Sequence, residues 1–233
     1  MTSIDGIVFD LDGTLWDTNA SCAVAWNRVV ERHHIPFRAI TERDIRAVTG
    51  KPHEECVAAI FDGLPQESIR LLSAETQVED NRVIAELGGE LFAGVEAGLR
   101  TLRNRYPLFI VSNCQAGYVE VFYRWSGLGN CFRDFECWGN TGRSKAENLR
   151  ALIDRNGLQH PIFVGDTSGD QLAARACGVP FLHAAYGFGR CDEGDQSFGS
   201  FDALMAWLLD GRPRSVNPSA PPGLYAPTKD RSA

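Results

Sequence analysis

The chain has 233 residues, of which 44% are hydrophobic and 23% are charged. This is the composition of an ordinary globular protein with enough chain for one large core or two modest ones. The formal net charge is −7, and without clustered Lys and Arg it excludes a surface built to bind nucleic acid or anionic lipid. Neither a signal-peptide pattern nor an apolar run of membrane-spanning length is present, so we expect a cytoplasmic protein with no membrane partner.

The first predicted element is a short buried strand at residues 4–9, which ends before a turn at Gly13. Asp10 and Asp12 follow it, so two carboxylates lie at the carboxyl end of the strand, where open α/β sheets bind ligands. Two adjacent acids repel each other, and holding both ionised requires a counter-charge such as a divalent cation. An aspartate can also attack phosphorus. The pattern therefore predicts a reactive site at this sheet edge.

The block from residue 17 to residue 89 predicts helices and no strand. Thr41 begins an approximate capping pattern for a short helix, and Pro65 is placed to open a long helix that ends at Gly88 and Gly89. We therefore expect 17–89 to be a small all-helical subdomain inserted after the acidic loop.

Beyond residue 90, predicted helices and strands alternate. Strands are predicted at 108–111, 135–138, 162–164 and 179–182, and helices at 95–105, 116–125, 145–155, 169–176 and 202–209. Such alternation predicts a parallel sheet covered by helices on both faces. We therefore expect an α/β fold whose doubly wound, Rossmann-like core comprises 1–16 and 90–210. The Pro-rich tail, 211–233, is expected to be mobile.

Later strand and helix ends carry polar residues that are expected to face the same crevice as Asp10. They are Ser112 and Asn113 after the strand at 108–111, Asp166 and Asp170 after the strand at 162–164, and Lys145 at a helix start. A hydroxyl, an amide and backbone N–H groups suit a phosphate oxygen. A lysine supplies fixed positive charge where a phosphoryl group is transferred.

Together these motifs resemble those of the haloacid dehalogenase superfamily, in its phosphatase branch with a helical cap. Residues 10–15 (DLDGTL) resemble the family's first motif, and Ser112-Asn113 resembles its second. Lys145 is similar to the third motif, and residues 165–170 (GDTSGD) resemble the fourth. They occur in the family's order, and the resemblance covers residues 4–209. The first and fourth motifs are specific, whereas the second and third are short.

The resemblance implies a Mg²⁺-dependent phosphomonoesterase that acts on a small phosphorylated metabolite, of the phosphoglycolate or sugar phosphate type. It implies that Asp10 is the nucleophile that forms an aspartyl phosphate, and that Asp12 protonates the leaving oxygen and then activates water. Mg²⁺ would be held by Asp10, the backbone carbonyl of Asp12 and Asp166. Asp170 would ligate through water or orient its neighbours.

The remaining implied roles concern the substrate. The resemblance implies that Lys145 is catalytic and that Thr14, Ser112 and Asn113 bind the phosphoryl group. The loop 49–54 resembles a loop by which caps of this family reach the substrate, so Lys51 or His53 is a candidate to contact the leaving group. A solvated loop is the equally weighted alternative.

Several other interpretations stay open from the sequence. Asp166 and Asp170 also suit a simple helix cap. A phosphomutase would share the chemistry of Asp10, and a non-catalytic binding protein could share the fold, although such a protein should have lost acids that this chain keeps. A dehalogenase does not need the acid that Asp12 provides, and a phosphonate-cleaving relative lacks it. The sequence does not predict the oligomeric state.

Overall fold

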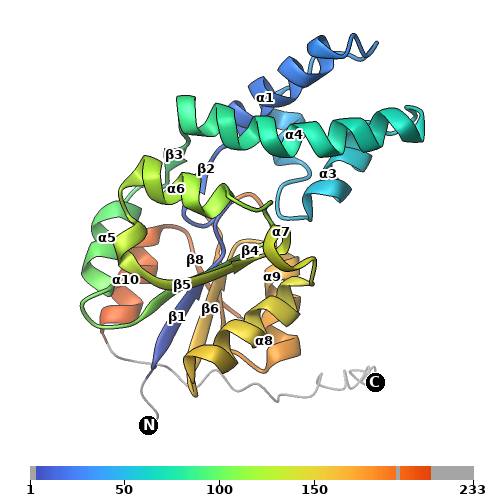
Figure 1. Ribbon diagram of the computed structural model, residues 1–233. Helices are drawn as coiled ribbons and strands as arrows, with labels where there is room; N and C mark the ends of the chain where they lie inside the picture. Colours follow the sequence, from blue (N-terminus) through green and yellow to red (C-terminus); the bar gives the residue numbers. More distant parts are fainter. Residues whose placement is uncertain (1–3, 193–194, 211–233) are drawn as a thin grey trace, which may run out of the picture.

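The computed structural model describes residues 4–192 and 195–210. Within them a parallel sheet has the strand order β5-β4-β1-β6-β7-β8 (Figure 1). Its strands are β1 (Gly6–Phe9), β4 (Leu108–Ser112), β5 (Phe132–Cys137), β6 (Pro161–Gly165), β7 (Phe181–Ala184) and β8 (Gln196–Phe198). Central β1 pairs with β4 on one side and β6 on the other. This architecture confirms the predicted α/β class.

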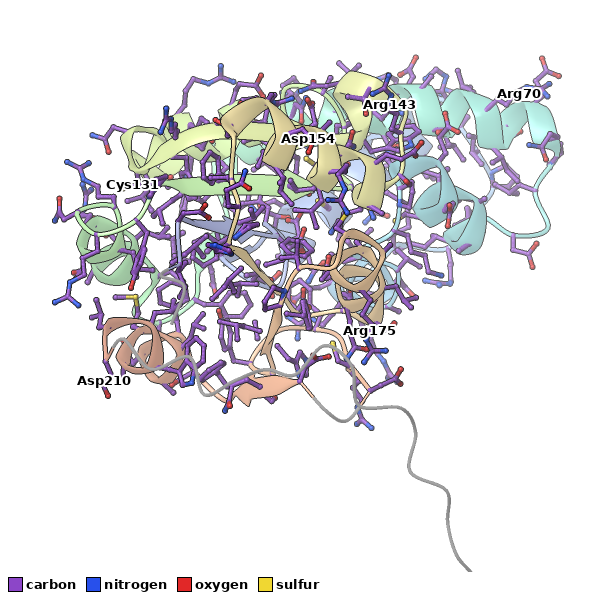
Figure 2. The ribbon with its side chains drawn as sticks, turned by 90° about the horizontal axis from the view of Figure 1, so that it is seen from below. Arg70, Cys131, Arg143, Asp154, Arg175 and Asp210 are labelled. Atoms are coloured by element: carbon purple, nitrogen blue, oxygen red, sulfur yellow. The ribbon has the colours of Figure 1, made fainter. Side chains whose placement is uncertain are left out.

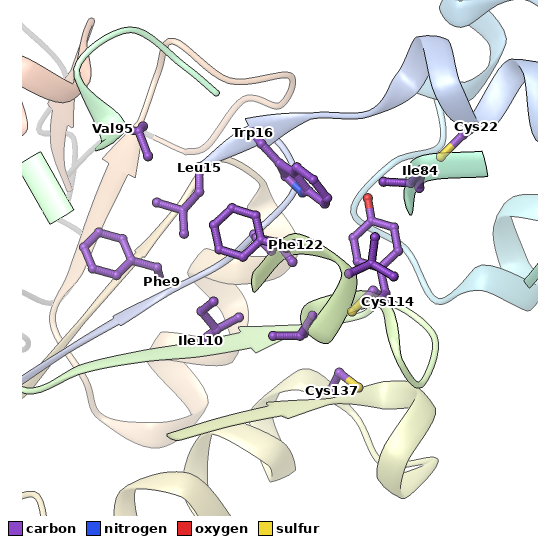
Figure 3. Packing of buried hydrophobic residues seen from close by; sticks show 14 of the residues in the cluster. Phe9, Leu15, Trp16, Cys22, Ile84, Val95, Ile110, Cys114, Phe122 and Cys137 are labelled. Carbon is purple, nitrogen blue, oxygen red and sulfur yellow. The ribbon is translucent and has the colours of Figure 1, made fainter. Parts of the chain in front are cut away.

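Both faces of the sheet are covered by helices, because alternate side chains of each strand enter opposite cores. One face packs against α5 (Val95–Leu102), α6 (Tyr118–Ser126) and α10 (Phe201–Leu209), and the other against α8 (Lys145–Asn156) and α9 (Ser168–Cys177). In β1, Ile7 and Phe9 enter the first core and Val8 enters the second. Figure 3 shows Phe9 and Ile110 in the first core, with Phe122 of α6.

In the sequence, the segment between β1 and β4 contains four helices that form a separate layer. These are α1 (Asn19–Arg32), α2 (Glu42–Arg46), α3 (His53–Ile60) and α4 (Gln66–Leu87). Thr41 caps α2 with the predicted capping box, and Pro65 is the N-cap of α4. This α1–α4 layer lies beyond the carboxyl ends of the strands, and Arg70 marks the outer end of α4 (Figures 1 and 2). No helix of the described residues is long and apolar enough to cross a membrane.

A two-stranded antiparallel ribbon joins this layer to the sheet. It pairs β2 (Trp16–Asp17) with β3 (Glu90–Leu91). The expectation of no strand from residue 17 was therefore wrong at Asp17, since a two-residue strand leaves no periodic signal. The Trp16 ring is buried and lies edge-on to Phe122 at a centroid distance of 4.9 Å (Figure 3).

Four further elements differ from the sequence expectation or fall outside it. Strand β5 begins at Phe132, ahead of the predicted 135, because this edge strand alternates with polar residues that weaken its apolar signal. Strand β8, the 3₁₀ turn η1 (Gly129–Cys131) and the short helix α7 (Trp138–Thr141) were not predicted. The predicted mobile tail, 211–233, lies outside the described residues.

Candidate active site

Asp10 lies directly after β1, at the carboxyl edge of the sheet. Its side chain is buried, and its Oδ1 accepts a hydrogen bond from Lys145 Nζ at 2.7 Å. The same ammonium group donates to Asp170 Oδ1 at 2.6 Å. Burial lowers the pKa of Lys145, but the two carboxylates outweigh burial and raise it above its ordinary value. Lys145 is therefore a fixed positive charge between two acids that come from distant parts of the chain.

Three acids lie close together next to Lys145. Asp10, Asp166 and Asp170 each offer one carboxylate oxygen, and these oxygens lie within 4.8 Å of one another. Burial, followed by repulsion from Asp170, raises the pKa of Asp10 well above its usual range and that of Asp166 to about 7. One lysine does not balance three buried carboxylates, and hard oxygen donors this close together are the ligands that Mg²⁺ takes. The residues present therefore fit a divalent cation.

Asp166 is held in this cluster by backbone groups. Its Oδ2 accepts hydrogen bonds from the N–H groups of Phe188 at 2.8 Å and Gly189 at 3.1 Å. Gly13 lies against the same carboxylate with φ of +83°, and a Cβ at this position would collide with Asp166. The glycine of the first motif is therefore required both by its backbone conformation and by the close approach of Asp166.

Asp170 combines the two roles that the sequence left open. Its Oδ1 binds Lys145, while its Oδ2 accepts hydrogen bonds from the backbone N–H of Thr167 at 3.0 Å and from the Thr167 hydroxyl at 2.7 Å. These last contacts complete the capping box of α9. Asp170 is therefore a helix cap with one oxygen and a member of the acidic cluster with the other.

The side chain of Asp12 lies apart from the cluster and contacts α6. Its Oδ1 accepts hydrogen bonds from Tyr118 Oη at 2.6 Å and from Thr18 Oγ1 at 3.3 Å. Burial raises the pKa of Asp12 to about 6, although the Tyr118 hydrogen bond opposes this. The sequence analysis missed Tyr118, because it lies on the apolar face of a helix and reads there as a core residue.

A cavity of about 70 Å³ lies between the sheet edge and the α1–α4 layer. Asp10, Asp12, Lys145, Ser112 and Asn113 line it from the sheet side. The Ser112 hydroxyl accepts a hydrogen bond from the Cys114 N–H at 3.2 Å, and Asn113 Nδ2 donates to the Gly50 carbonyl at 2.9 Å. The structure thus brings these predicted site residues to one cavity, and Asn113 also joins the sheet side to the opposite loop.

The other three predicted substrate-binding residues lie in different places. Lys51 and His53 line the cavity from the opposite wall, with Lys51 exposed and His53 buried. Thr14 lies outside the cavity lining, and its hydroxyl donates to Asp166 Oδ1 at 3.4 Å. Thr14 is therefore placed to orient an acid of the cluster.

Comparison with known proteins gives matches along most of the chain. The family model for haloacid dehalogenase-like hydrolases matches residues 7–184. The chain is 27% identical over 195 residues to the probable phosphatase IndB of Dickeya dadantii, covering 80% of this chain and 84% of that protein. It is 28% identical over 228 residues to a phosphoglycolate phosphatase of Xanthomonas campestris pv. campestris, covering 95% of each.

Among solved structures, the chain is similar to a predicted phosphoglycolate phosphatase from Haemophilus somnus 129pt. The TM-score is 0.78 at 19% identity, covering 89% of this chain and 99% of that one. Such an identity supports the fold alone, but the family model spans well over half of the chain. The predicted superfamily is confirmed, and the chain belongs to the haloacid dehalogenase-like hydrolases.

Proposed function

We propose that this protein is a Mg²⁺-dependent phosphomonoesterase that hydrolyses a small phosphorylated metabolite through an aspartyl phosphate. One observation carries the proposal: a buried aspartate, Asp10, lines a cavity beside Lys145, and Asp12 lines the same cavity. Nucleophile, fixed charge and acid are then within one site. The relatives named phosphatase support the same reaction class.

In the first proposed step, an oxygen of Asp10 attacks phosphorus. The P–O bond to the leaving alcohol breaks, and Asp12 transfers its proton to that alcohol oxygen. In the second step, Asp12, now a carboxylate, removes a proton from water as the water oxygen attacks phosphorus. The bond between phosphorus and Asp10 breaks, and inorganic phosphate leaves. A pKa of about 6 suits Asp12 to both directions of proton transfer near neutral pH.

Asp10, Asp166 and Asp170, with the backbone carbonyl of Asp12, would hold the metal ion. When bound, Mg²⁺ would supply positive charge against the carboxylates and the transferring phosphoryl group. Lys145 and the hydroxyl of Ser112 would hold phosphoryl oxygens, and the amide of Asn113 would do so once released from Gly50. The proximity of the three carboxylates supports this ligand set.

We also propose that 17–89 is a cap over a core made of 1–16 and 90–210, with the β2–β3 ribbon as its hinge. Closing the cap would exclude water from the cavity, as lids do in other enzymes. The hydrogen bond from Asn113 to the Gly50 carbonyl, which joins the two walls, supports a closed arrangement.

The proposed function is tested by phosphate release from a panel of sugar phosphates, phosphoglycolate and p-nitrophenyl phosphate. We expect release with Mg²⁺, loss of at least about 99% of it after chelation, and recovery when Mg²⁺ is restored. Release that survives chelation would contradict the metal requirement. Conversion of a sugar phosphate to its isomer without phosphate release would indicate a phosphomutase.

The Tyr118 hydroxyl is expected to be needed for the acid–base role of Asp12. Replacing Tyr118 with Phe removes a 2.6 Å hydrogen bond that lowers the pKa of this carboxyl. We expect kcat to fall about tenfold, with a smaller change in KM, and the pH–rate profile to shift upward. Steady-state kinetics between pH 5 and 9 measures both effects.

Tyr123→Phe is the matched control for this prediction. Tyr123 lies in the same helix, and its ring stacks on Phe132 at a centroid distance of 5.7 Å. This variant should keep the wild-type kcat and pH profile. Equal kinetics for the two variants would show that the hydroxyl of Tyr118 has no role in the reaction.

A further inference from the structure

Asp80 is a buried acid on the cavity wall formed by the α1–α4 layer, and the proposed reaction steps do not use it. It lies in α4, is 3% exposed and lines the cavity together with Asp10. Both of its carboxylate oxygens accept from Trp26 Nε1, at 3.1 Å each, and the Cys22 thiol is a second donor to this carboxyl group. His53 Nδ1 is 3.7 Å from Oδ2, beyond hydrogen-bond distance. Asp80 therefore keeps free acceptor capacity in the cavity wall.

The surroundings of Asp80 do not suit an anion. Burial lowers the pKa of His53 to about 4, so its ring is neutral at pH 7, and its Nε2 is 2.8 Å from Thr76 Oγ1. Among the described lining residues, Lys51 is the one lysine or arginine that 17–89 contributes, and it is exposed. Burial, with a further contribution from the charge of Asp12, raises the pKa of Asp80 well above its usual range. An anionic group beside Asp80 would meet a carboxyl group and no buried lysine or arginine from 17–89.

Asn19 offers the complementary donor on the same cavity. It is 1% exposed, and its Oδ1 accepts from Thr49 Oγ1 at 2.8 Å. Its Nδ2 has no hydrogen-bond partner among the described residues. A free donor on Asn19 and a free acceptor on Asp80 match a hydroxyl group, which both donates and accepts. Whether charged or protonated, Asp80 offers an acceptor oxygen to such a group.

We propose that Asp80 and Asn19 bind a hydroxyl of the leaving group, so that the preferred substrate is a phosphate monoester of a polyol or sugar. The inference rests on the proposed phosphatase function and narrows its substrate class. An analogue without the hydroxyl leaves buried polar groups unpaired, which penalises it. An analogue with a carboxylate in that place, as in phosphoglycolate, brings an acid against Asp80.

The test compares straight-chain phosphate esters of two to five carbons that end in a hydroxyl, a methyl or a carboxylate group, with p-nitrophenyl phosphate as a reference. We expect kcat/KM for the hydroxylated ester to exceed both others by about tenfold or more at the chain length that reaches Asp80. Equal values for hydroxyl and methyl at every length, or a preference for carboxylate, overturns the inference and leaves the phosphatase standing. No release from any ester overturns the phosphatase, and the inference with it.

Single substitutions then show which residues cause the preference for the hydroxylated ester. Asp80→Leu should abolish the preference for hydroxyl over methyl, Asp80→Asn should keep most of it because an acceptor oxygen remains, and Asn19→Ala should weaken it independently. Glu79→Gln is the matched control, since Glu79 is also 3% exposed but pairs with Arg32 at 2.8 Å outside the cavity lining. The ratio is measured within each variant and does not depend on the folded fraction. Full preference in both Asp80→Leu and Asn19→Ala would overturn the assignment.

Discussion

Asp10→Asn is expected to lower phosphate release by about 10⁴-fold or more, because an amide cannot form the aspartyl phosphate. The variant should remain folded. The pKa of the Asp10 carboxyl is raised well above its usual range by burial and by Asp170, so the wild-type charge is held at a cost that the neutral amide avoids. Lys145 keeps its 2.6 Å contact with Asp170. Phosphate release with saturating Mg²⁺, together with a thermal melt, measures both expectations.

Asp5→Asn makes the same substitution at the opposite end of β1. Asp5 accepts hydrogen bonds from the backbone N–H groups of Gln159 at 2.6 Å and His160 at 3.0 Å. Weakening them should lower the free energy of unfolding by about 1 kcal/mol and leave kcat within roughly twofold of the wild type. If Asp10→Asn retained more than about 1% of the wild-type rate, Asp10 would not be the nucleophile.

The positions of the residues that line the cavity from the sheet side could be predicted because their signals are local. Asp10 directly follows a buried strand, and Lys145 is the first residue of α8, where the sequence predicts a helix start. In a parallel sheet the carboxyl ends of the strands meet at one edge, so finding each strand end was enough to bring distant residues together. The predicted helices that cover the sheet also agree with the structure to within a few residues, because their signals are local in the sequence.

The opposite wall of the cavity could not be predicted, because it depends on how α1 packs against α4. Asp80 reads as one of many surface acids, yet it continues a stripe of buried positions along α4 that includes Leu72, Thr76 and Val83. Helical spacing from these residues was the available signal. Only the packed structure places the Trp26 indole against this acid and turns both toward the cavity. The ribbon strands β2 and β3 could not be predicted either, because a strand of two residues is too short to show an alternating apolar pattern.

Lys145→Met should be the most destabilising single change at the site, because it leaves buried Asp10 and Asp170 without their shared cation. Breaking a buried ion pair by removing one partner costs about 3–5 kcal/mol, and we expect the free energy of unfolding to fall by that amount at pH 8 without metal. Loss of the fixed charge should also lower kcat by about 10³-fold. Lys51→Met, which removes an exposed lysine, should change stability by less than about 0.5 kcal/mol.

Lys145→Met is expected to lower the free energy of unfolding, and the pH dependence of this deficit distinguishes the loss of a charge from the loss of a packing contact. In the wild type the pKa of Asp10 is already raised by burial, and Lys145 is the group that opposes the rise. Without the lysine that pKa climbs further above its unfolded value of about 3.9. A carboxyl with a raised folded pKa favours folding at low pH and loses that contribution as pH rises through the folded pKa. Urea unfolding should therefore show a smaller deficit at pH 5 than at pH 8. A deficit that is equal at both values would mean that Lys145 stabilises the fold through packing of its aliphatic stem and not through its charge.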